Sequence, residues 1–589
     1  MAKISAQSSR PKNTKGTLVR TMKYLAPYKF ILFVAIVLTL ISNVLALLGP
    51  KYAGNAINEA AAGEGLVNFD SVLHFVFLML IVYVVSSILS IVISVIMTSL
   101  SKKVACKMRN DVFNKLMKLP VSFYHNNSVG DIISRVSYDV DVVSTCIATD
   151  ITQIMTSLVT VIGSLIMMVY LSPLLSLIVI ITVPISIGYT VYMRKKVRPR
   201  YSRRSKSYGN MNGFAEEMLS GEKTIQAYAY EETACKKFDI VNTEAADAYY
   251  DAESYSCTMG PTVGFINNLS LSLIALLGTV FFMNGIATLD TISSFVLYSR
   301  KFSGPINEIA NIVNELFSAL SAAERVFNLL DAEEECADSE NAVELTNVNG
   351  KVELTHVKFG YIEGKTILHD LSLVAKPGQT VAIIGPTGAG KTTIINLLMR
   401  FYDVNDGNIY VDDGEIRDYT RSSLRGAYAM VLQDTWVFNG TIFENIAYGK
   451  QDATMEEVVA AAKSAHIHSF IMQLPEGYNT VISEDGGNIS KGQKQLLTIA
   501  RAMLYNSKML ILDEATSNVD TSTEQKVQKA MRELMKGKTC FVIAHRLSTI
   551  QNADLILVVN HGDVVEQGSH SDLMKNKGFY YNLYTAQFE

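Results

Sequence analysis

Residues 385–392 have the sequence G-P-T-G-A-G-K-T, which matches the phosphate-binding pattern GxxxxGK[ST]. The glycines let backbone N–H groups face phosphate oxygens, and the N-terminus of a following helix adds partial positive charge. Lys391 supplies a cation for the terminal phosphates, and the Thr392 hydroxyl suits Mg²⁺. The segment therefore predicts that the chain binds a nucleoside triphosphate through Gly385, Pro386, Thr387, Gly388, Ala389, Gly390, Lys391, Thr392 and Thr393.

The flanks of this loop support the same interpretation. The apolar run 381–384 has the length and composition of a buried strand, and residues 392–399 have the pattern of a helix start. The alternative is a glycine-rich turn that matches the pattern by chance. Such a turn would need neither a strand before it nor a helix after it. The order strand, loop, helix favours the phosphate site.

A pair of acids follows a second apolar run, at 509–512. An acid at the end of a strand that faces a phosphate loop can hold Mg²⁺ or its waters, which is the role expected of Asp513. Glu514 can polarise the attacking water. The pair alone is a weak signal, but it stands between ISKGQKQ (489–495) and ATSNVD (515–520).

The elements that position these residues form only part of the chain. The protein has 589 residues, 49% of them hydrophobic, and a mean hydropathy of +0.20. A membrane-spanning helix needs about 20 apolar residues. Five uncharged segments meet that length, and a sixth is expected because an even number returns the C-terminal half to the side of the N-terminus. The five are 30–50, 73–97, 151–171, 174–193 and 260–282, and the sixth is 291–312.

Arg300 and Lys301 interrupt the sixth segment. About nine residues into a helix they would lie about 15 Å deep, where charged side chains usually face a water-filled pathway. The alternative is that the span begins earlier and both side chains reach the inner surface. We favour the pathway.

Basic residues set the expected orientation. Seven lie in the first 29 residues, six in 102–118 and eight in 194–206, whereas the other connections have almost none. The positive-inside rule then places the N-terminus and these loops in the cytoplasm of a multi-pass cell-membrane protein. A transit peptide is the alternative for the basic start, but a full span follows it directly. The net charge of −4 and six scattered cysteines indicate no nucleic-acid partner and no zinc site.

We therefore expect an α-helical membrane domain with six transmembrane helices, followed by a C-terminal α/β P-loop domain. The stretches 102–150 and 194–256 keep helical periodicity and many charges, which indicates cytoplasmic extensions of the membrane helices. The expected divisions are a basic N-terminus (1–29), the membrane domain (30–330), an acidic linker (331–350) and the nucleotide-binding domain (351–589).

The assembled motifs resemble the ATP-binding cassette (ABC) family, specifically exporters whose membrane and nucleotide-binding halves are fused. ISKGQ is similar to the LSGGQ signature, with Ile489 and Lys491 as substitutions, and SNVD is similar to the D-loop. In the membrane half, 123–141 and 216–228 resemble the two intracellular loops of such exporters. Three further residues match family positions: Gln433 of the Q-loop, the switch histidine His545 and the adenine-stacking aromatic Tyr361.

The resemblance implies roles for these positions. Tyr361 would stack on adenine, Gln433 would touch Mg²⁺ or the attacking water, and His545 would contact the γ-phosphate, with Glu514 as general base. Because each ATP in this family lies between two cassettes, a second half-transporter subunit is required. The residues that would complete a nucleotide site across that interface are Ser490, Gly492, Gln493 and Asp520.

The identity of that partner is open between a second copy and a different chain. Lys491 stands where the common signature has glycine. The sequences NISKGQKQ and DEATSNVD resemble those of the catalytic-glutamate subunit of bacterial heterodimeric exporters. A heterodimer is therefore favoured. The implied function is ATP-driven export of hydrophobic or amphipathic small molecules, lipids or peptides across the lipid bilayer by alternating access. An ATP-gated channel or regulator without turnover, or an importer of the same fold, is the alternative.

Overall fold

The structure is a computed structural model that describes residues 13–61, 67–362, 364–433, 435–483, 488–513, 521–544 and 547–588. The chain forms two compact units. The first, the membrane unit, comprises the residues up to Lys118 together with Ser128–Glu333. The second, the cassette unit, comprises Glu334–Glu589 and also the short segment Leu119–Asn127, which comes from between two membrane-unit helices in the sequence.

The membrane unit is built from helices, as predicted. Five stretches in the described residues are long and apolar enough to cross a membrane: Thr14–Ala60, Phe69–Leu116, Val129–Leu171, Pro173–Ser220 and Glu231–Met283. Each contains one of the five clear spans expected from the sequence. The elements are α1 (Thr14–Leu25), η1 (Ala26–Tyr28), α2 (Lys29–Ala60), α3 (Phe69–Leu116), α5 (Val129–Ser134), η2 (Arg135–Asp139), α6 (Val140–Thr145), η3 (Cys146–Asp150), α7 (Ile151–Leu171), α8 (Pro173–Ser220), α9 (Glu222–Ala227), α10 (Glu231–Met283) and α11 (Leu289–Leu330).

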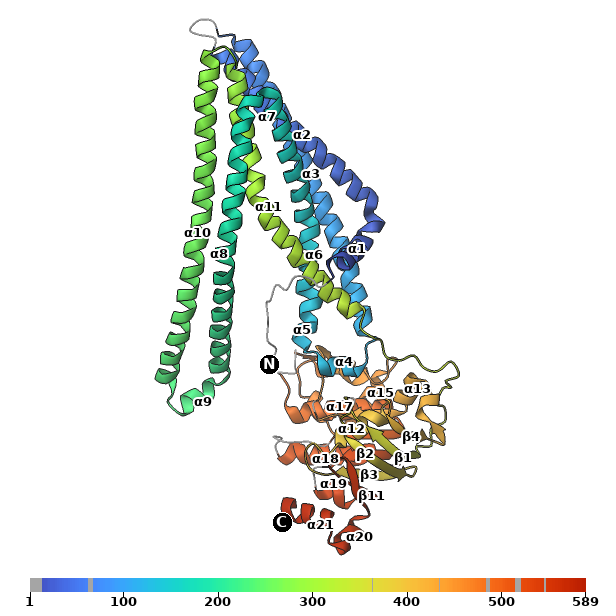
Figure 1. The fold of residues 1–589 in the computed structure, drawn as a ribbon. Coiled ribbons are helices and arrows are strands. Elements are labelled where there is room, and N and C mark those ends of the chain that lie inside the picture. Colours follow the sequence, from blue (N-terminus) through green and yellow to red (C-terminus); the bar gives the residue numbers. More distant parts are fainter. Residues whose placement is uncertain are drawn as a thin grey trace. The chain divides into compact units, whose positions relative to one another are not determined.

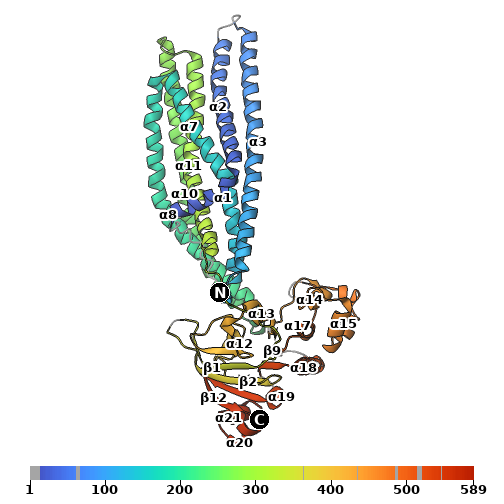
Figure 2. The same cartoon turned by 90° about the vertical axis from the view of Figure 1, so that its right-hand side faces the viewer.

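The expected helical extensions are present. Helices α8 and α10 run side by side over their lengths and are joined by the short helix α9 (Figure 1). Between them, Arg200 Nε donates to Asp251 at 3.2 Å and Arg204 pairs with Glu253 at 2.5 Å. Helices α2 and α3 form a second pair (Figure 2). Charged residues thus connect the extended parts of long continuous helices.

The sixth expected span lies within α11, whose crossing of the membrane stays a prediction. Three side chains of α11 donate hydrogen bonds to backbone carbonyls of α2. Ser294 Oγ donates to Pro50 at 3.1 Å, and Tyr298 OH donates to Leu47 at 2.6 Å. The third donor is Lys301, whose Nζ lies 2.5 Å from the carbonyl oxygen of Ala46.

This last bond has a clear physical cause. Pro50 has no N–H, so it cannot bond to the carbonyl of Ala46 one turn earlier in α2. An unbonded carbonyl is costly in an apolar environment, and the Lys301 ammonium satisfies it. Lys301 is half-buried in a contact between helices, whereas Arg300 is exposed. The pathway hypothesis therefore stays a prediction for Arg300, and Lys301 has a structural partner.

The cassette unit is an α/β domain with the helix α4 (Val121–Asn126) packed on it. Its strands are β1 (Val352–Phe359), β2 (Leu368–Ala375), β3 (Thr380–Ile384), β4 (Asp406–Val411), β5 (Gly414–Glu415), β6 (Tyr428–Val431), β7 (Gly440–Thr441), β8 (Val481–Ile482), β9 (Met509–Asp513), β10 (Thr539–Ile543), β11 (Leu555–Asn560) and β12 (Asp563–Gly568). Its helices are α12 (Lys391–Leu398), η4 (Ile416–Asp418), α13 (Arg421–Gly426), α14 (Ile442–Ala447), α15 (Met455–Ser464), α16 (His468–Ile471), η5 (Gly477–Asn479), α17 (Lys491–Tyr505), α18 (Thr521–Met535), α19 (Leu547–Gln551), α20 (His570–Asn576) and α21 (Phe579–Phe588).

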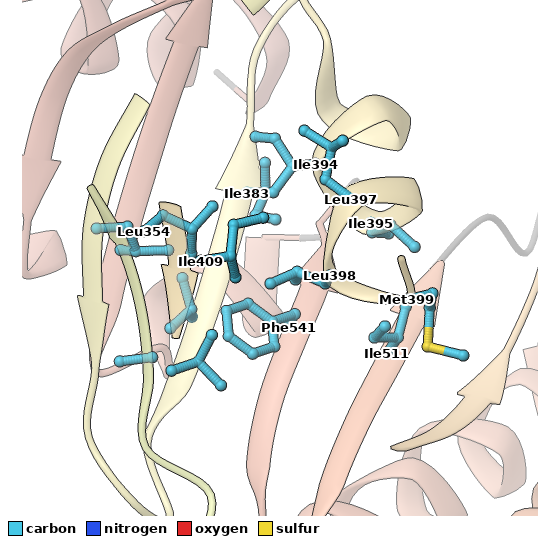
Figure 3. Close-up of a cluster of buried hydrophobic side chains, with 14 of the residues drawn as sticks. Leu354, Ile383, Ile394, Ile395, Leu397, Leu398, Met399, Ile409, Ile511 and Phe541 are labelled. Carbon is cyan, nitrogen blue, oxygen red and sulfur yellow. The ribbon is translucent and has the colours of Figure 1, made fainter. Parts of the chain in front are cut away.

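Ten strands form one sheet in the order β5-β4-β1-β2-β12-β11-β3-β10-β9-β6. Strands β11, β3, β10, β9 and β6 run parallel to one another, β12 is antiparallel to β11, and β5, β4, β1 and β2 form an antiparallel arm. Helix α12 packs its apolar side on the parallel part: Ile394, Leu397 and Leu398 lie against Ile383 and Phe541 in one buried cluster (Figure 3). This core fixes the helix that follows the phosphate loop.

An ion pair with a buried carboxylate in the membrane unit yields a stability prediction. Asp139, at the end of η2, is 2% exposed and accepts two bonds from the Arg325 guanidinium of α11, at 2.9 and 2.5 Å. Replacing Arg325 by Ala leaves this carboxylate buried without its partner. We expect Arg325→Ala to destabilise the protein by about 1.5–3 kcal/mol, the range for a hydrogen bond to a charged group.

The check is the thermal-unfolding midpoint of the detergent-solubilised chain. The matched control is Asp141→Ala, which removes an exposed pair with Arg109 two positions further on and should cost about 0–1 kcal/mol. Equal midpoints for the two variants would show that burial of Asp139 adds nothing.

Candidate functional site

The phosphate loop connects β3 to α12, as the sequence predicts. Its glycines are required by both space and conformation. A Cβ on Gly385 would lie 2.0 Å from the carbonyl oxygen of Val559, and Gly390, the residue that caps α12, has φ +105°. Gly388 has φ +83°. These positions favour glycine because positive φ costs other residues about 1–2 kcal/mol.

Lys391, at the first position of α12, closes the loop on itself. Its Nζ donates to the carbonyl oxygens of Gly385 at 2.8 Å and Pro386 at 3.0 Å. Burial lowers the pKa of this lysine, and the charge of Asp513 acts in the opposite direction. A half-buried ammonium is thus held over the loop, where it can meet an incoming phosphate.

The loop opens into a cavity of about 510 Å³. The cavity brings together three oxygen donors that the sequence assigns to Mg²⁺: the Thr392 hydroxyl, the Gln433 amide and the Asp513 carboxylate. Hard oxygen ligands of this kind suit Mg²⁺. Elsewhere in the described residues, no group of three or more His, Cys, Asp or Glu side chains could hold a metal ion. The lining residues are Ile367, Thr387, Gly388, Gly390, Lys391, Thr392, Thr393, Gln433, Asp513 and Ile543.

The sheet explains how Asp513 reaches this cavity. Asp513 ends β9 and pairs in register with Ile543, the last residue of β10, while Ile543 also pairs with Ile383 of β3. The carboxyl ends of the three parallel strands therefore lie at one edge. This edge is where open α/β sheets bind ligands.

Tyr361 borders the same site without lining the cavity. It lies just after β1, and the residue is 41% exposed. The hydroxyl lies 3.3 Å from Oγ1 of Thr393 and accepts a hydrogen bond from Asn396 Nδ2 at 3.0 Å. Both partners belong to α12, so the ring is anchored to the helix that follows the phosphate loop.

The signature segment lies apart from this cavity. Ser490 caps α17: its Oγ accepts from the N–H of Gln493 at 3.3 Å, and Gln493 Oε1 accepts from the N–H of Ser490 at 2.8 Å. Gly492 is buried, and the Lys491 side chain is exposed. Ser490, Gly492 and Gln493 thus form a helix start that is not part of the cavity lining in the same chain.

Three predicted residues, Glu514, Asp520 and His545, lie outside the described residues. Glu514 directly follows Asp513 in the sequence, and His545 comes two residues after Ile543. Their roles stay predictions.

Sequence reasoning missed several residues around the site. Ile367 and Ile543 line the cavity but carry no chemical signal. Tyr402 packs its ring against Tyr361, with centroids 4.9 Å apart, and His125 bonds to Tyr402. No motif marks Tyr402, and the loop resemblance that includes His125 does not indicate a contact with the site, because the two residues become neighbours only through folding.

Comparison with known proteins agrees with the fold. Residues 32–306 match the family described as "ABC transporter transmembrane region", and residues 368–517 match the family described as "ABC transporter". The uncharacterized ABC transporter ATP-binding protein YfiC of Bacillus subtilis (strain 168) is 41% identical over 581 residues, which cover 99% of this chain and 96% of that protein.

Two further similarities extend over nearly the whole chain. The fatty acid ABC transporter ATP-binding/permease protein of Mycobacterium bovis (strain ATCC BAA-935 / AF2122/97) is 38% identical over 615 residues, 98% of this chain and 97% of that protein. The structure of a bacterial Atm1-family ABC exporter with ATP bound has a TM-score of 0.76 and 28% identity, and the match covers 96% of this chain and 99% of that one.

A helical membrane unit fused to a phosphate-binding α/β unit defines a transporter half with its own ATPase. The chain belongs to the ABC transporter family, as an exporter-type half-transporter. It binds ATP and couples ATP hydrolysis to transport as a multi-pass membrane protein.

The lowered pKa of Lys391 yields a pH prediction. The protonated ammonium is the form that attracts phosphate, and burial makes Lys391 lose its proton at a lower pH than an ordinary lysine does. Above that pH, ATP binding must restore the proton, so we expect ATP affinity to fall on the alkaline side. Titrating ATP binding to the full chain between about pH 7 and 10 measures this fall.

Lys391→Arg serves as the control, because a guanidinium stays protonated throughout this range. Its ATP affinity should not fall in the same way, whatever its absolute value. Identical pH profiles for the two proteins would contradict the assignment to Lys391.

Proposed function

We propose that this protein is one subunit of a dimeric exporter that uses ATP to move hydrophobic or amphipathic molecules across the cell membrane. The observation that carries the proposal is the cavity at the carboxyl ends of β3, β9 and β10, which joins the phosphate loop to Gln433 and Asp513. Closure of two cassettes on ATP would open the membrane units outward, and hydrolysis would reset them.

The proposed roles are supported by the described positions of Lys391, Tyr361, Thr392, Gln433 and Asp513, and for Glu514 and His545 by the resemblance to the family alone. Lys391 and the N–H groups at the start of α12 would hold the phosphates, and Tyr361 would stack on the adenine. Thr392, Gln433 and Asp513 would hold Mg²⁺, which when bound neutralises charge on the terminal phosphates. Glu514 would accept the proton of the attacking water, and His545 would orient the γ-phosphate.

A second subunit is part of the proposal. The capped start of α17, with Ser490, Gly492 and Gln493, is a helix N-terminus suited to phosphate, yet it is not part of the cavity lining in its own chain. It would instead complete the site of the partner, together with Asp520. The exposed Lys491 and the sequences of the motifs NISKGQKQ and DEATSNVD favour a different half-transporter as the partner over a second copy of this chain.

Orientation and substrate belong to the proposal as well. The clusters of Lys and Arg support a cytoplasmic N-terminus, and an even number of spans would put the cassette on the same side. The relative from Mycobacterium bovis is named for fatty acids, which supports an amphipathic substrate among the drugs, lipids and peptides that an apolar pathway accommodates. Import by the same fold is the remaining alternative, and the direction of transport in vesicles separates the two.

The assignment of Glu514 as general base yields a prediction. Glu514→Gln keeps the size of the side chain but removes the base, so we expect ATP hydrolysis to fall by about 10²–10⁴-fold with ATP binding retained. Phosphate release from the purified transporter measures the loss of hydrolysis. Uptake of a fluorescent fatty acid into inside-out vesicles measures the loss of transport that should accompany it.

Glu533→Gln, an exposed glutamate of α18 that pairs only locally with Lys536, is the matched control and should leave both rates unchanged. ATP hydrolysis that persists in Glu514→Gln would overturn the assignment. Export of no amphipathic tracer by the parent protein would overturn the substrate class.

The subunit proposal is tested by expressing the chain alone and together with a second half-transporter from the same organism. We expect the pair to copurify at 1:1 stoichiometry and the chain alone to show little ATPase activity, because a complete site needs both cassettes. A purified chain that is dimeric and fully active by itself would show a homodimer.

A further inference from the structure

A cluster of four aromatic rings joins the helix α4 to the nucleotide site. Helix α4 belongs to the cassette unit, although its sequence lies between two helices of the membrane unit. His125, near the end of α4, has its Nδ1 2.8 Å from the hydroxyl of Tyr402. The two rings are also stacked, with centroids 6.2 Å apart and an interplanar angle of 15°.

Tyr402 in turn supports Tyr361. The rings of Tyr402 and Tyr361 meet edge to face, with centroids 4.9 Å apart and an angle of 81°. Phe359 contacts both, at 5.6 Å from Tyr402 and 5.0 Å from Tyr361. Tyr402 is half-buried, and this burial raises the pKa of its hydroxyl. Edge contacts among the three rings leave Tyr361 little freedom to tilt.

The position of Tyr361 matters because a stacking ring binds a base only in one orientation. Its hydroxyl is anchored to α12 through Thr393 and Asn396, but two polar bonds at one atom do not fix the rotation of the ring. The edge contacts with Tyr402 and Phe359 supply that constraint. Each aromatic pair of this kind changes an equilibrium constant by about two- to tenfold, and an ordered site binds more tightly because less freedom is lost on binding.

We propose that His125 and Tyr402 are positioning residues for the adenine site, so that the seating of α4 sets the affinity of this cassette for adenine nucleotides. The inference rests on the proposed function, because it takes Tyr361 as the ring that stacks on adenine. By linkage the effect is reciprocal. If the packing of α4 on the cassette unit strengthens ATP binding, bound ATP strengthens that packing by the same factor. Occupancy of the adenine site is thereby signalled to the loop that continues into the membrane unit.

The test compares two ligands on the full transporter in lipid nanodiscs. A non-hydrolysable ATP analogue requires the adenine site, whereas inorganic triphosphate requires only the phosphate loop. We expect His125→Ala and Tyr402→Phe, which both remove the hydrogen bond, to weaken the analogue about two- to fivefold, and Tyr402→Ala to weaken it about tenfold. Binding of inorganic triphosphate should stay within about twofold in all three.

The chain offers a matched control. His468 and Tyr478 form the same kind of bond, Nδ1 to OH at 2.8 Å, and neither residue lines the cavity. His468→Ala should leave the affinity for both ligands unchanged. Equal losses in His468→Ala and His125→Ala, or equal losses for both ligands in Tyr402→Ala, would show general damage and overturn the proposal.

A double-mutant comparison separates the inference from the proposed function. Tyr361→Ala removes the stacking ring, and if Tyr402 acts through that ring, Tyr361→Ala with Tyr402→Ala should bind the analogue no more weakly than Tyr361→Ala alone. If Tyr361→Ala itself leaves binding unchanged, the adenine role of Tyr361 is wrong and the inference falls with it. If Tyr361→Ala weakens binding while the His125 and Tyr402 variants do not, only the inference is overturned.

Discussion

The parallel pairing of β3, β10 and β9 is the constraint on which the nucleotide site depends. Ile543 of β10 pairs with Ile383 on one side and with Asp513 on the other, so the carboxyl ends of three strands are level. A shift of register by two residues would move the Asp513 carboxylate by about 7 Å from the phosphate loop. The apolar contact between α12 and these strands holds the loop against the same edge (Figure 3).

The membrane unit is held together under a different constraint. Its long helices expose apolar side chains, so little hydrophobic energy separates a helix facing lipid from one facing another helix. Polar contacts therefore carry much of the specificity. Lys301 and Tyr298 of α11 satisfy carbonyls of α2 close to Pro50, and Arg325 satisfies the buried Asp139. Charges that suggested a transport pathway in the sequence are in part structural.

Features that depend on a local sequence pattern could be predicted, whereas contacts between distant segments could not. Strand, loop and helix around residues 381–399 could be predicted, because the apolar run and the glycine pattern are local signals. The five clear spans could be predicted because a bilayer demands about 20 consecutive apolar residues. The partner of Lys301 could not, since the carbonyl of Ala46 becomes available only through a proline in a helix about 250 residues away. The cluster of His125, Tyr402 and Tyr361 has the same character.

The sequence by itself determined the family, the residues of the phosphate loop and the division into an apolar helical half and an α/β half, because these depend on side-chain type and on spacing along one segment. Only the tertiary structure decided which of the named residues share one cavity. Thr392, Gln433 and Asp513 come from three separate segments and are brought together by strand order and register. Tertiary structure also decided that a six-residue helix from between two membrane helices packs on the cassette. The sequence could not predict this packing, because ring contacts and a single hydrogen bond leave no periodic pattern in it.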